Sequence, residues 1–193
     1  MTTTRIGTTS DIPGVLALQE KYLYKNLNEA ERKRGFVTTP FTAEQIEEII
    51  TQNGLFVATD ENSEIVAYAF AGSWTYFEQW EIFNFMVSRF PQMSFQDKPI
   101  TTEKSFQYGP ICIDLRYRGS GLLNQLFEEM RIEFFKRYPI SVTFINQVNE
   151  ISEKAHTKKL GWEIVDAFRF NEKDYIALAF DMSRSVLGGR IRV

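Results

Sequence analysis

An apolar segment of the sequence passes through two glycines into an amphipathic stretch, over residues 111–123. Gly119 and Gly121 allow the backbone to approach a ligand closely, because glycine has no Cβ. The first N–H groups of a helix have no partner within it and lie at the positive end of its dipole. Arg116 and Arg118 add positive charge just before the turn. The segment therefore predicts a site for an anion such as a phosphate.

Two familiar nucleotide motifs do not match this spacing. A Rossmann fingerprint needs a third glycine at position 124, where the chain has Asn124. A Walker loop needs a Gly-Lys-Ser/Thr ending, and the sequence has none. The alternative to a phosphate site is a tight strand-to-helix turn that binds nothing.

The loop resembles motif A of the GNAT acyltransferase superfamily, [QR]xxGx[GA], through Arg116, Gly119 and Gly121, with Leu115 where proline is common. The resemblance implies that the loop holds the pyrophosphate of acetyl-CoA and that the backbone of the preceding strand holds the pantetheine arm. The residues that it places at the cofactor are Cys112, Ile113, Arg116, Arg118, Gly119, Ser120, Gly121, Leu122 and Asn149.

A second segment resembles motif B of the same family, NxxAxxxY followed by LGF. It contains Asn149, Ser152, His156 and then residues 160–162, Leu-Gly-Trp. His156 lies seven residues after Asn149, where the family has the tyrosine that protonates the departing thiolate, so either His156 or Thr157 takes that position. A solvent-facing helix histidine is the alternative for His156. Asn149 could bind the cofactor, cap the next helix, or do both.

The resemblance implies an N-acetyltransferase without a metal, which transfers an acetyl group from acetyl-CoA to a primary amine of a small molecule or peptide by direct attack. An amine with a pKa of about 10.4 is neutral in only about one molecule in a thousand near pH 7.4, so its deprotonation is the larger demand. The alternative is a CoA-binding module that regulates a partner without catalysis. The candidate bases, of which Glu103 is the first choice, are Glu103, Glu78, Glu81, Tyr108 and Asp114.

Hydrophobic periodicity predicts the elements that position these residues. Helices are expected after the caps Ser10 and Thr42 and over residues 76–90, 120–137 and 151–160. Strands are expected over residues 3–8, 55–59, 65–74, 106–115, 140–146, 162–170 and 175–182.

This order of elements mixes hairpins with one strand-helix-strand crossover, which predicts an α/β sheet of mixed direction. Residues 106–115 are apolar enough to predict a central strand. The GNAT resemblance further implies a mostly antiparallel sheet of about seven strands, flanked by helices and splayed at its centre to hold CoA. The aromatic stretch 76–90 is expected to wall the acceptor pocket, to pack in the core or to form a homodimer face.

The composition of the chain indicates how many domains it has and which partners and compartments are expected. The 193 residues are 44% hydrophobic, which suits one domain over residues 1–182 with a tail at 183–193. A net charge of -3 offers no overall basic field for a nucleic acid. The single cysteine, Cys112, is expected to be a buried core thiol. The sequence shows no secretory signal and no run of about 18 apolar residues, so we expect a soluble cytoplasmic protein without a membrane partner.

Overall fold

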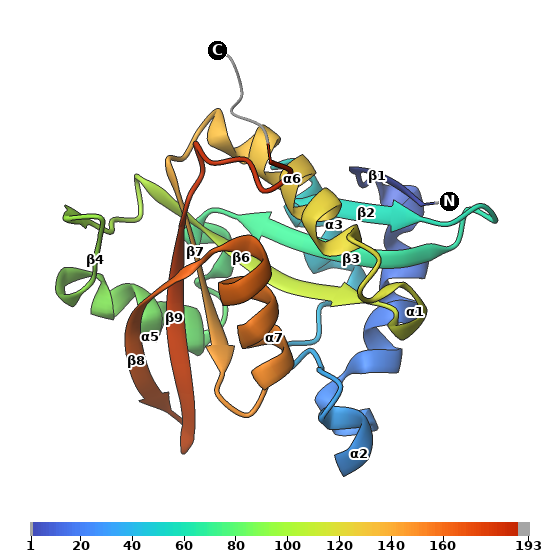
Figure 1. The fold of residues 1–193 in the computed structure, drawn as a ribbon, viewed down its shortest axis with the longest axis horizontal. Helices are drawn as coiled ribbons and strands as arrows, with labels where there is room; N and C mark the ends of the chain where they lie inside the picture. Colours follow the sequence, from blue (N-terminus) through green and yellow to red (C-terminus); the bar gives the residue numbers. More distant parts are fainter. Residues whose placement is uncertain (1, 189–193) are drawn as a thin grey trace. The chain divides into compact units, whose positions relative to one another are not determined.

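The structure is a computed structural model that describes residues 2–188 of the chain. Within those residues, seven strands form one sheet in the order β1-β2-β3-β6-β7-β9-β8, and β4 and β5 form a separate hairpin. The strands are β1 (Thr3–Ile6), β2 (Leu55–Thr59), β3 (Ile65–Gly72), β4 (Ser94–Phe95), β5 (Lys98–Pro99), β6 (Ser105–Ile113), β7 (Ile140–Asn146), β8 (Glu163–Phe170) and β9 (Lys173–Asp181) (Figure 1). The helices are α1 (Ile12–Tyr22), α2 (Glu29–Arg32), α3 (Ala43–Ile50), α4 (Trp74–Phe77), α5 (Glu81–Arg89), α6 (Leu122–Phe135) and α7 (Glu150–Lys154).

The sheet confirms the predicted α/β architecture of mixed, mostly antiparallel direction. The pairs β1–β2, β2–β3, β7–β9 and β8–β9 are antiparallel, and the β6–β7 pair is parallel. The strand β6 is fourth in the order of seven among the described residues, as its apolar sequence predicts. The short hairpin β4–β5 was not predicted, and its turn residues Gln96 and Asp97 both have positive φ, at 50° and 60°.

The described residues divide into two compact units. Unit one is built from the described parts of 1–71, 109–133 and 185–193, and unit two from 72–108 and 134–184. The single domain predicted for residues 1–182 stays a prediction. The predicted tail is described as far as residue 188, and residues 189–193 lie outside the described part.

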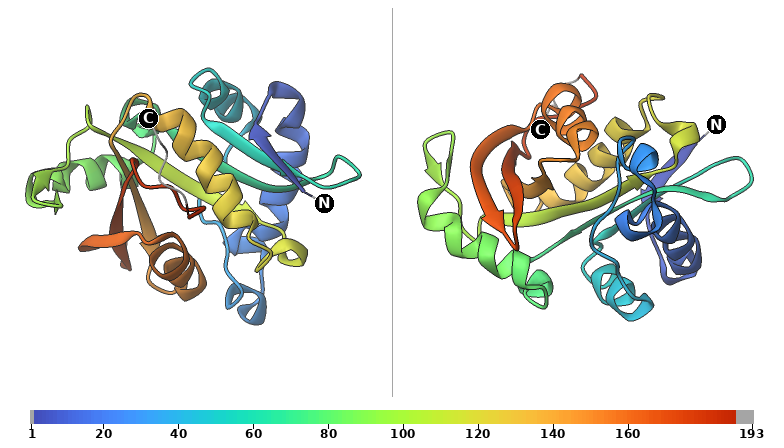
Figure 2. Two further views of the ribbon diagram at one scale, coloured as in Figure 1. Left: turned by 45° about the horizontal axis from the view of Figure 1, so that its top comes forward. Right: turned by 90° about the horizontal axis from the view of Figure 1, so that it is seen from below.

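In unit one, helices cover both faces of the strands. Figure 2 shows α1 and α3 on one face of β2 and β3 and α6 on the other. The burial pattern agrees, because successive residues of β2 point to opposite faces and Phe56, Val57 and Ala58 are all fully buried. No helix within residues 2–188 has the length and apolar character needed to cross a membrane.

Local sequence signals account for several element boundaries. The turn from β2 to β3 forms at Asp60, whose Oδ1 accepts hydrogen bonds from the backbone N–H groups of Asn62 at 2.9 Å and Glu64 at 3.0 Å. The predicted capping box at the start of α3 is confirmed, with the side chains of Thr42 and Gln45 each bonded to the other's backbone N–H.

The aromatic helix predicted over residues 76–90 is two helices, so this prediction was wrong in its continuity. Trp80 has an extended backbone, with φ -113° and ψ 126°, and separates α4 from α5. The side-chain amide of Asn84 donates to the carbonyl oxygen of Glu78 at 2.6 Å across the break. The Trp80 ring lies among those of Tyr76 and Phe83, with centroids 5.8 and 5.9 Å away. Aromatic packing therefore continues where the helix stops.

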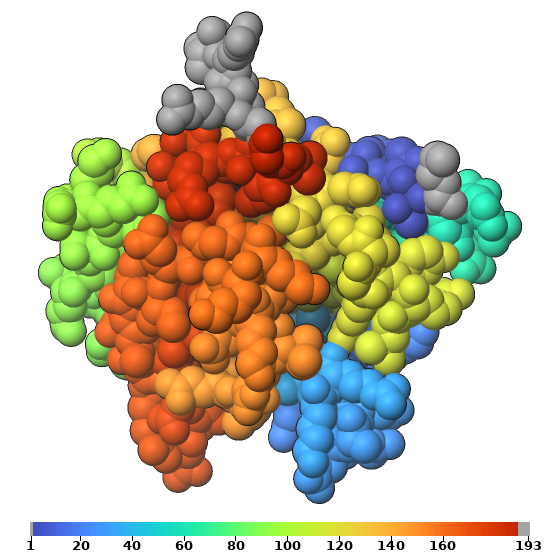
Figure 3. All heavy atoms as spheres, viewed as in Figure 1, coloured from blue at the N-terminus to red at the C-terminus, as the bar shows by residue number. Residues whose placement is uncertain are grey.

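Two charged residues of α6, Glu128 and Arg131, are buried. Arg131 is 0% exposed and donates to both oxygens of Glu128, at 2.9 and 2.7 Å. The segment 185–188 lies against this helix (Figure 3), and the backbone N–H of Val186 donates to Glu128 Oε2 at 3.1 Å. A helical-wheel pattern cannot show such a contact with a distant segment.

The substitution Glu128→Gln should lower the free energy of unfolding by about 3 kcal/mol, because it removes a charged partner from the fully buried Arg131 guanidinium. Urea unfolding measures this change. Glu129→Gln, at the partly exposed neighbouring position, is the control and should change the same free energy by less than about 0.5 kcal/mol. Equal effects of the two substitutions would contradict a buried ion pair on α6.

Candidate functional site

The glycine loop between β6 and α6 has the geometry of an anion cradle. Gly119 and Gly121 have φ values of +81° and +88°, in the left-handed region that favours glycine. A Cβ built on either residue would meet no atom within 4 Å. Residues 119–121 are exposed, and the next residue begins α6, whose first N–H groups have no partner within the helix. The loop therefore presents backbone and open space at a helix start.

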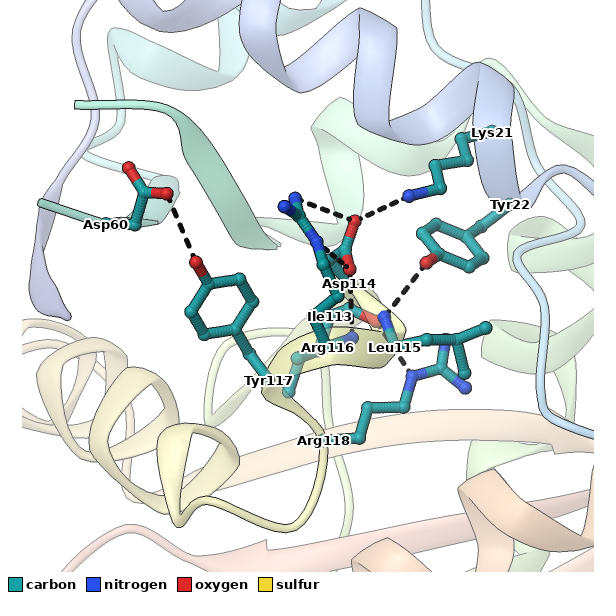
Figure 4. A network of polar contacts seen from close by, with 9 residues as sticks. All are labelled: Lys21, Tyr22, Asp60, Ile113, Asp114, Leu115, Arg116, Tyr117 and Arg118. Atoms are coloured by element: carbon teal, nitrogen blue, oxygen red, sulfur yellow. Dashed lines mark hydrogen bonds and ion pairs between the residues drawn. The ribbon is translucent and has the colours of Figure 1, made fainter. Parts of the chain in front are cut away.

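Asp114 is a buried carboxylate at the start of this loop. Its side chain is 3% exposed and accepts from Lys21 Nζ at 2.7 Å and from Arg116 Nε at 3.0 Å. It also accepts the backbone N–H of Arg116 at 3.0 Å, which caps the short turn 115–117 (Figure 4). Burial acts to raise the pKa of Asp114, but the hydrogen bonds from Arg116 and Lys21 outweigh it and lower that pKa to about 2. Asp114 is therefore a fixed anion near neutral pH and a poor base.

Arg118 is held by the protein on three sides. Its Nε donates to the carbonyl oxygen of Ile113 at 2.8 Å, and its Nη1 donates to the carbonyl oxygen of Arg34. Its guanidinium lies 5.2 Å from the centre of the Tyr22 ring. The hydroxyl oxygen of that tyrosine accepts the backbone N–H of Leu115 at 2.9 Å. Arg118 thus fixes the conformation of the loop from within.

Sequence reasoning missed Lys21 and Tyr22 as parts of this site. Both lie in the last turn of α1, 93 residues before their loop partners. Tyr22 has the helical spacing of a core residue and is 4% exposed, so its sequence pattern gives no sign of the hydroxyl contact. No signal in the sequence alone links these two residues to the loop.

The other predicted cofactor residues of unit one differ in exposure. Cys112 is 3% exposed, and burial raises the pKa of its thiol to about 12, which confirms the predicted core thiol. Leu122 is 1% exposed and starts α6. The Ser120 hydroxyl donates to the carbonyl oxygen of Tyr117 at 2.6 Å, and the Tyr117 hydroxyl donates to Asp60 at 3.1 Å.

His156 lies in unit two and is 3% exposed, so the solvent-facing alternative was wrong. Its Nδ1–H donates to the carbonyl oxygen of Ser152 at 2.7 Å, in a π-helical segment that follows α7. The rings of Tyr108 and Trp162 pack on it, with centroids 5.6 and 5.8 Å away. Burial lowers the pKa of His156 to about 4, so the imidazole is neutral at neutral pH. Thr157, the other candidate, donates its hydroxyl to the carbonyl oxygen of Glu153 at 2.9 Å.

The remaining candidates also lie in unit two. Asn149 caps α7, because its side chain accepts the backbone N–H of Ser152 at 3.3 Å, which confirms the capping role. Glu103 is exposed in a turn, and hydrogen bonds from its own backbone and from nearby threonine hydroxyls lower its pKa. Tyr108 is fully buried, and burial raises its pKa well above the usual value. Glu78 and Glu81 are exposed.

Within residues 2–188, no group of three or more His, Cys, Asp or Glu side chains is placed to hold a metal ion.

The buried His156 should make stability depend on pH. Its pKa is about 4 in the folded chain and 6.5 as its ordinary value, so the unfolded chain takes up a proton first as the pH falls. The free energy of unfolding should drop by about 2 kcal/mol between about pH 7 and about pH 5 from this residue alone. Urea unfolding of the native chain and of His156→Phe at both pH values isolates the effect, because His156 is the only histidine. An identical pH dependence in both proteins would contradict the buried, neutral imidazole.

Comparison with known proteins identifies solved structures of the same architecture, whereas no family model matches the chain. The N-acetyltransferase from Staphylococcus aureus Mu50 superposes with a TM-score of 0.62 at 18% identity, over 94% of this chain and 99% of that one. The protein yncA from Salmonella typhimurium, solved with its cofactor acetyl-CoA, superposes with a TM-score of 0.61 at 14% identity, over 100% of this chain and 99% of that one. The GNAT family N-acetyltransferase YhbS from Escherichia coli, in complex with CoA, superposes with a TM-score of 0.55 at 16% identity, over 98% of this chain and 86% of that one.

Proposed function

The chain has the fold of the GNAT N-acetyltransferases, and on that basis we propose that it is an acyl-CoA-dependent N-acyltransferase. It transfers an acetyl group from acetyl-CoA to a primary amine of a small molecule or peptide, by direct attack in a ternary complex. The observation that carries the proposal is the loop, where two glycines with positive φ leave open space at the start of α6. Two similar structures hold acetyl-CoA or CoA, which supports a ligand of this class.

The backbone of the loop is the proposed binding element for the pyrophosphate. The N–H groups of residues 119–122 are suited to phosphate oxygens, because they combine close approach with the positive end of a helix dipole. Arg116 and Arg118 already bond to protein groups, so their guanidinium groups serve the loop rather than stand free for the ligand. Bound acetyl-CoA supplies the thioester from which the acetyl group is transferred. The backbone of Cys112 and Ile113 is proposed to hold its pantetheine arm.

The proton of the attacking amine has no well-suited acceptor among the candidate bases. Removing a proton from an amine with a pKa of about 10.4 near pH 7.4 costs about 4 kcal/mol. Asp114 is a poor base because its pKa is lowered. Tyr108 is also a poor base, because burial raises the pKa of its phenol and keeps it protonated. We therefore assign the proton to solvent, because the first candidate, Glu103, is exposed and its pKa is lowered as well. The neutral His156 is assigned to packing beside α7 rather than to the role of general acid.

A CoA-binding module without catalysis is the second candidate. One observation favours it: neither His156 nor Glu103 has a pKa shifted toward neutrality. Turnover separates the two functions. Release of free thiol from acetyl-CoA in the presence of a primary amine supports the transferase, whereas CoA binding without thiol release for any amine in a broad panel supports the module.

The double substitution Gly119→Ala and Gly121→Ala should abolish the binding of acetyl-CoA. At a hundredfold excess over Kd, acetyl-CoA should raise the unfolding temperature of the native chain by roughly 5 to 11 °C. The variant should show no such rise, because alanine at positive φ distorts the loop and its methyl groups enter the open space.

Gly188→Ala is the matched control for this experiment. Gly188 has a φ of +78° and equally open surroundings, and it lies in the tail rather than in the loop. This variant should keep the full temperature rise. An undiminished rise in the double variant would show that the phosphate site lies elsewhere.

A further inference from the structure

We propose that Lys21 and Asp114 are positioning residues for the phosphate loop, and that the ion triad Lys21–Asp114–Arg116 holds the loop in its binding conformation without contacting the phosphate itself. This inference rests on the proposed function. It adds a role for α1, the helix that carries Lys21, in setting the affinity of a site 93 residues further along the chain.

The two cations of the triad bond to both oxygens of one buried carboxylate, that of Asp114. Asp114 Oδ2 accepts from Lys21 Nζ at 2.7 Å, and Oδ1 accepts from both the backbone N–H and the side-chain Nε of Arg116, each at 3.0 Å. The carboxylate is 3% exposed, whereas the side chains of Lys21 and Arg116 are 54% and 62% exposed. The Asp114 carboxylate is therefore buried in the protein, and Lys21 and Arg116 contact it from the solvent-exposed side.

Four of the five residues from 114 to 118 form hydrogen bonds to parts of unit one outside this segment, and Arg116 bonds to Asp114 within it. The backbone N–H of Leu115 donates to the Tyr22 hydroxyl, that of Arg116 donates to Asp114, and the Tyr117 hydroxyl donates to Asp60 (Figure 4). The backbone N–H of Asp114 donates to the carbonyl oxygen of Val66 at 2.9 Å, and the Arg118 side chain donates to the carbonyl oxygens of Ile113 and Arg34. The glycines follow directly after this anchored segment. Without these hydrogen bonds the glycine loop would adopt many conformations in the free protein. Binding would then have to order the loop, and this loss of conformational entropy would weaken the affinity.

The cations of the triad face a hollow other than the space above the glycines. Lys21, Asp114 and Arg116 line a pocket of about 450 Å³ together with α1 and the turn before β3. None of residues 118–122 belongs to the lining of that pocket in the described part of the chain. This placement favours a positioning role over direct contact between Lys21 and a phosphate on the loop.

The two roles make opposite predictions for Asp114→Asn. If the cations contact the phosphates, removing a nearby negative charge frees them and CoA binds more tightly. If the triad positions the loop, the same substitution weakens the contacts to Lys21 and Arg116, and CoA binds less tightly. Hydrogen bonds to charged groups are among the stronger ones, so we expect the dissociation constant for CoA to rise about tenfold or more.

Titration calorimetry with CoA on the full chain measures this constant for the native protein and for Asp114→Asn. Tighter or unchanged binding by Asp114→Asn would overturn the positioning role while leaving the proposed function standing. A native chain that does not bind CoA at all would instead refute the proposed function. The two failures are therefore distinguishable in one experiment.

Lys21→Met provides a variant at an exposed position, in case Asp114→Asn does not fold. We expect the affinity for CoA to fall several-fold and to be restored by Lys21→Arg, which keeps the positive charge beside Asp114. In steady-state kinetics, KM for acetyl-CoA should rise while kcat at saturation is unchanged, because the loop affects binding rather than acyl transfer.

Lys33→Met is the matched control for Lys21→Met. Lys33 forms an exposed ion pair with Glu29 in the same unit, at 3.5 Å, and loses the same charge on substitution. It should leave the affinity for CoA unchanged. Equal losses of affinity in the two methionine variants would reduce the effect of Lys21 to general charge and overturn its positioning role.

Discussion

The conformation of the loop between β6 and α6 depends on one buried charge. Asp114 is a carboxylate with 3% exposure, and it is stable there because Lys21 and Arg116 donate to both of its oxygens. The same carboxylate caps the turn that leads to the glycines, so the electrostatics of the triad and the conformation of the loop cannot be separated. The helix α1 and the strand β3 surround this start of the loop, through contacts of Lys21, Tyr22 and the carbonyl oxygen of Val66.

Much of the fold could be predicted because its signals are local. The capping box at Thr42 sets the start of α3, and the apolar run of β6 marks a central strand. The glycine turn before α6 is also local, since Gly119 and Gly121 stand directly before that helix. In each case the residues that determine the structure lie within a few positions of one another, and the resemblance to GNAT proteins is confirmed as a likeness of fold.

The features that sequence reasoning missed depend on contacts between distant segments. Lys21 and Tyr22 meet the loop only through folding, and Glu128 accepts a hydrogen bond from a tail residue more than fifty positions downstream. The burial of His156 has the same origin, because the aromatic rings around it come from other elements. A pattern along one helix cannot distinguish a charged residue that faces water from one that another segment covers.

Binding of CoA by the loop is tested by following the backbone amide resonances of the ¹⁵N-labelled chain by NMR during titration with CoA. We expect the largest shifts on residues 119–122, whose N–H groups are proposed to hold the pyrophosphate, and smaller shifts on Cys112 and Ile113. Saturable shifts confined to other parts of the chain, or no shifts at millimolar CoA, would contradict it.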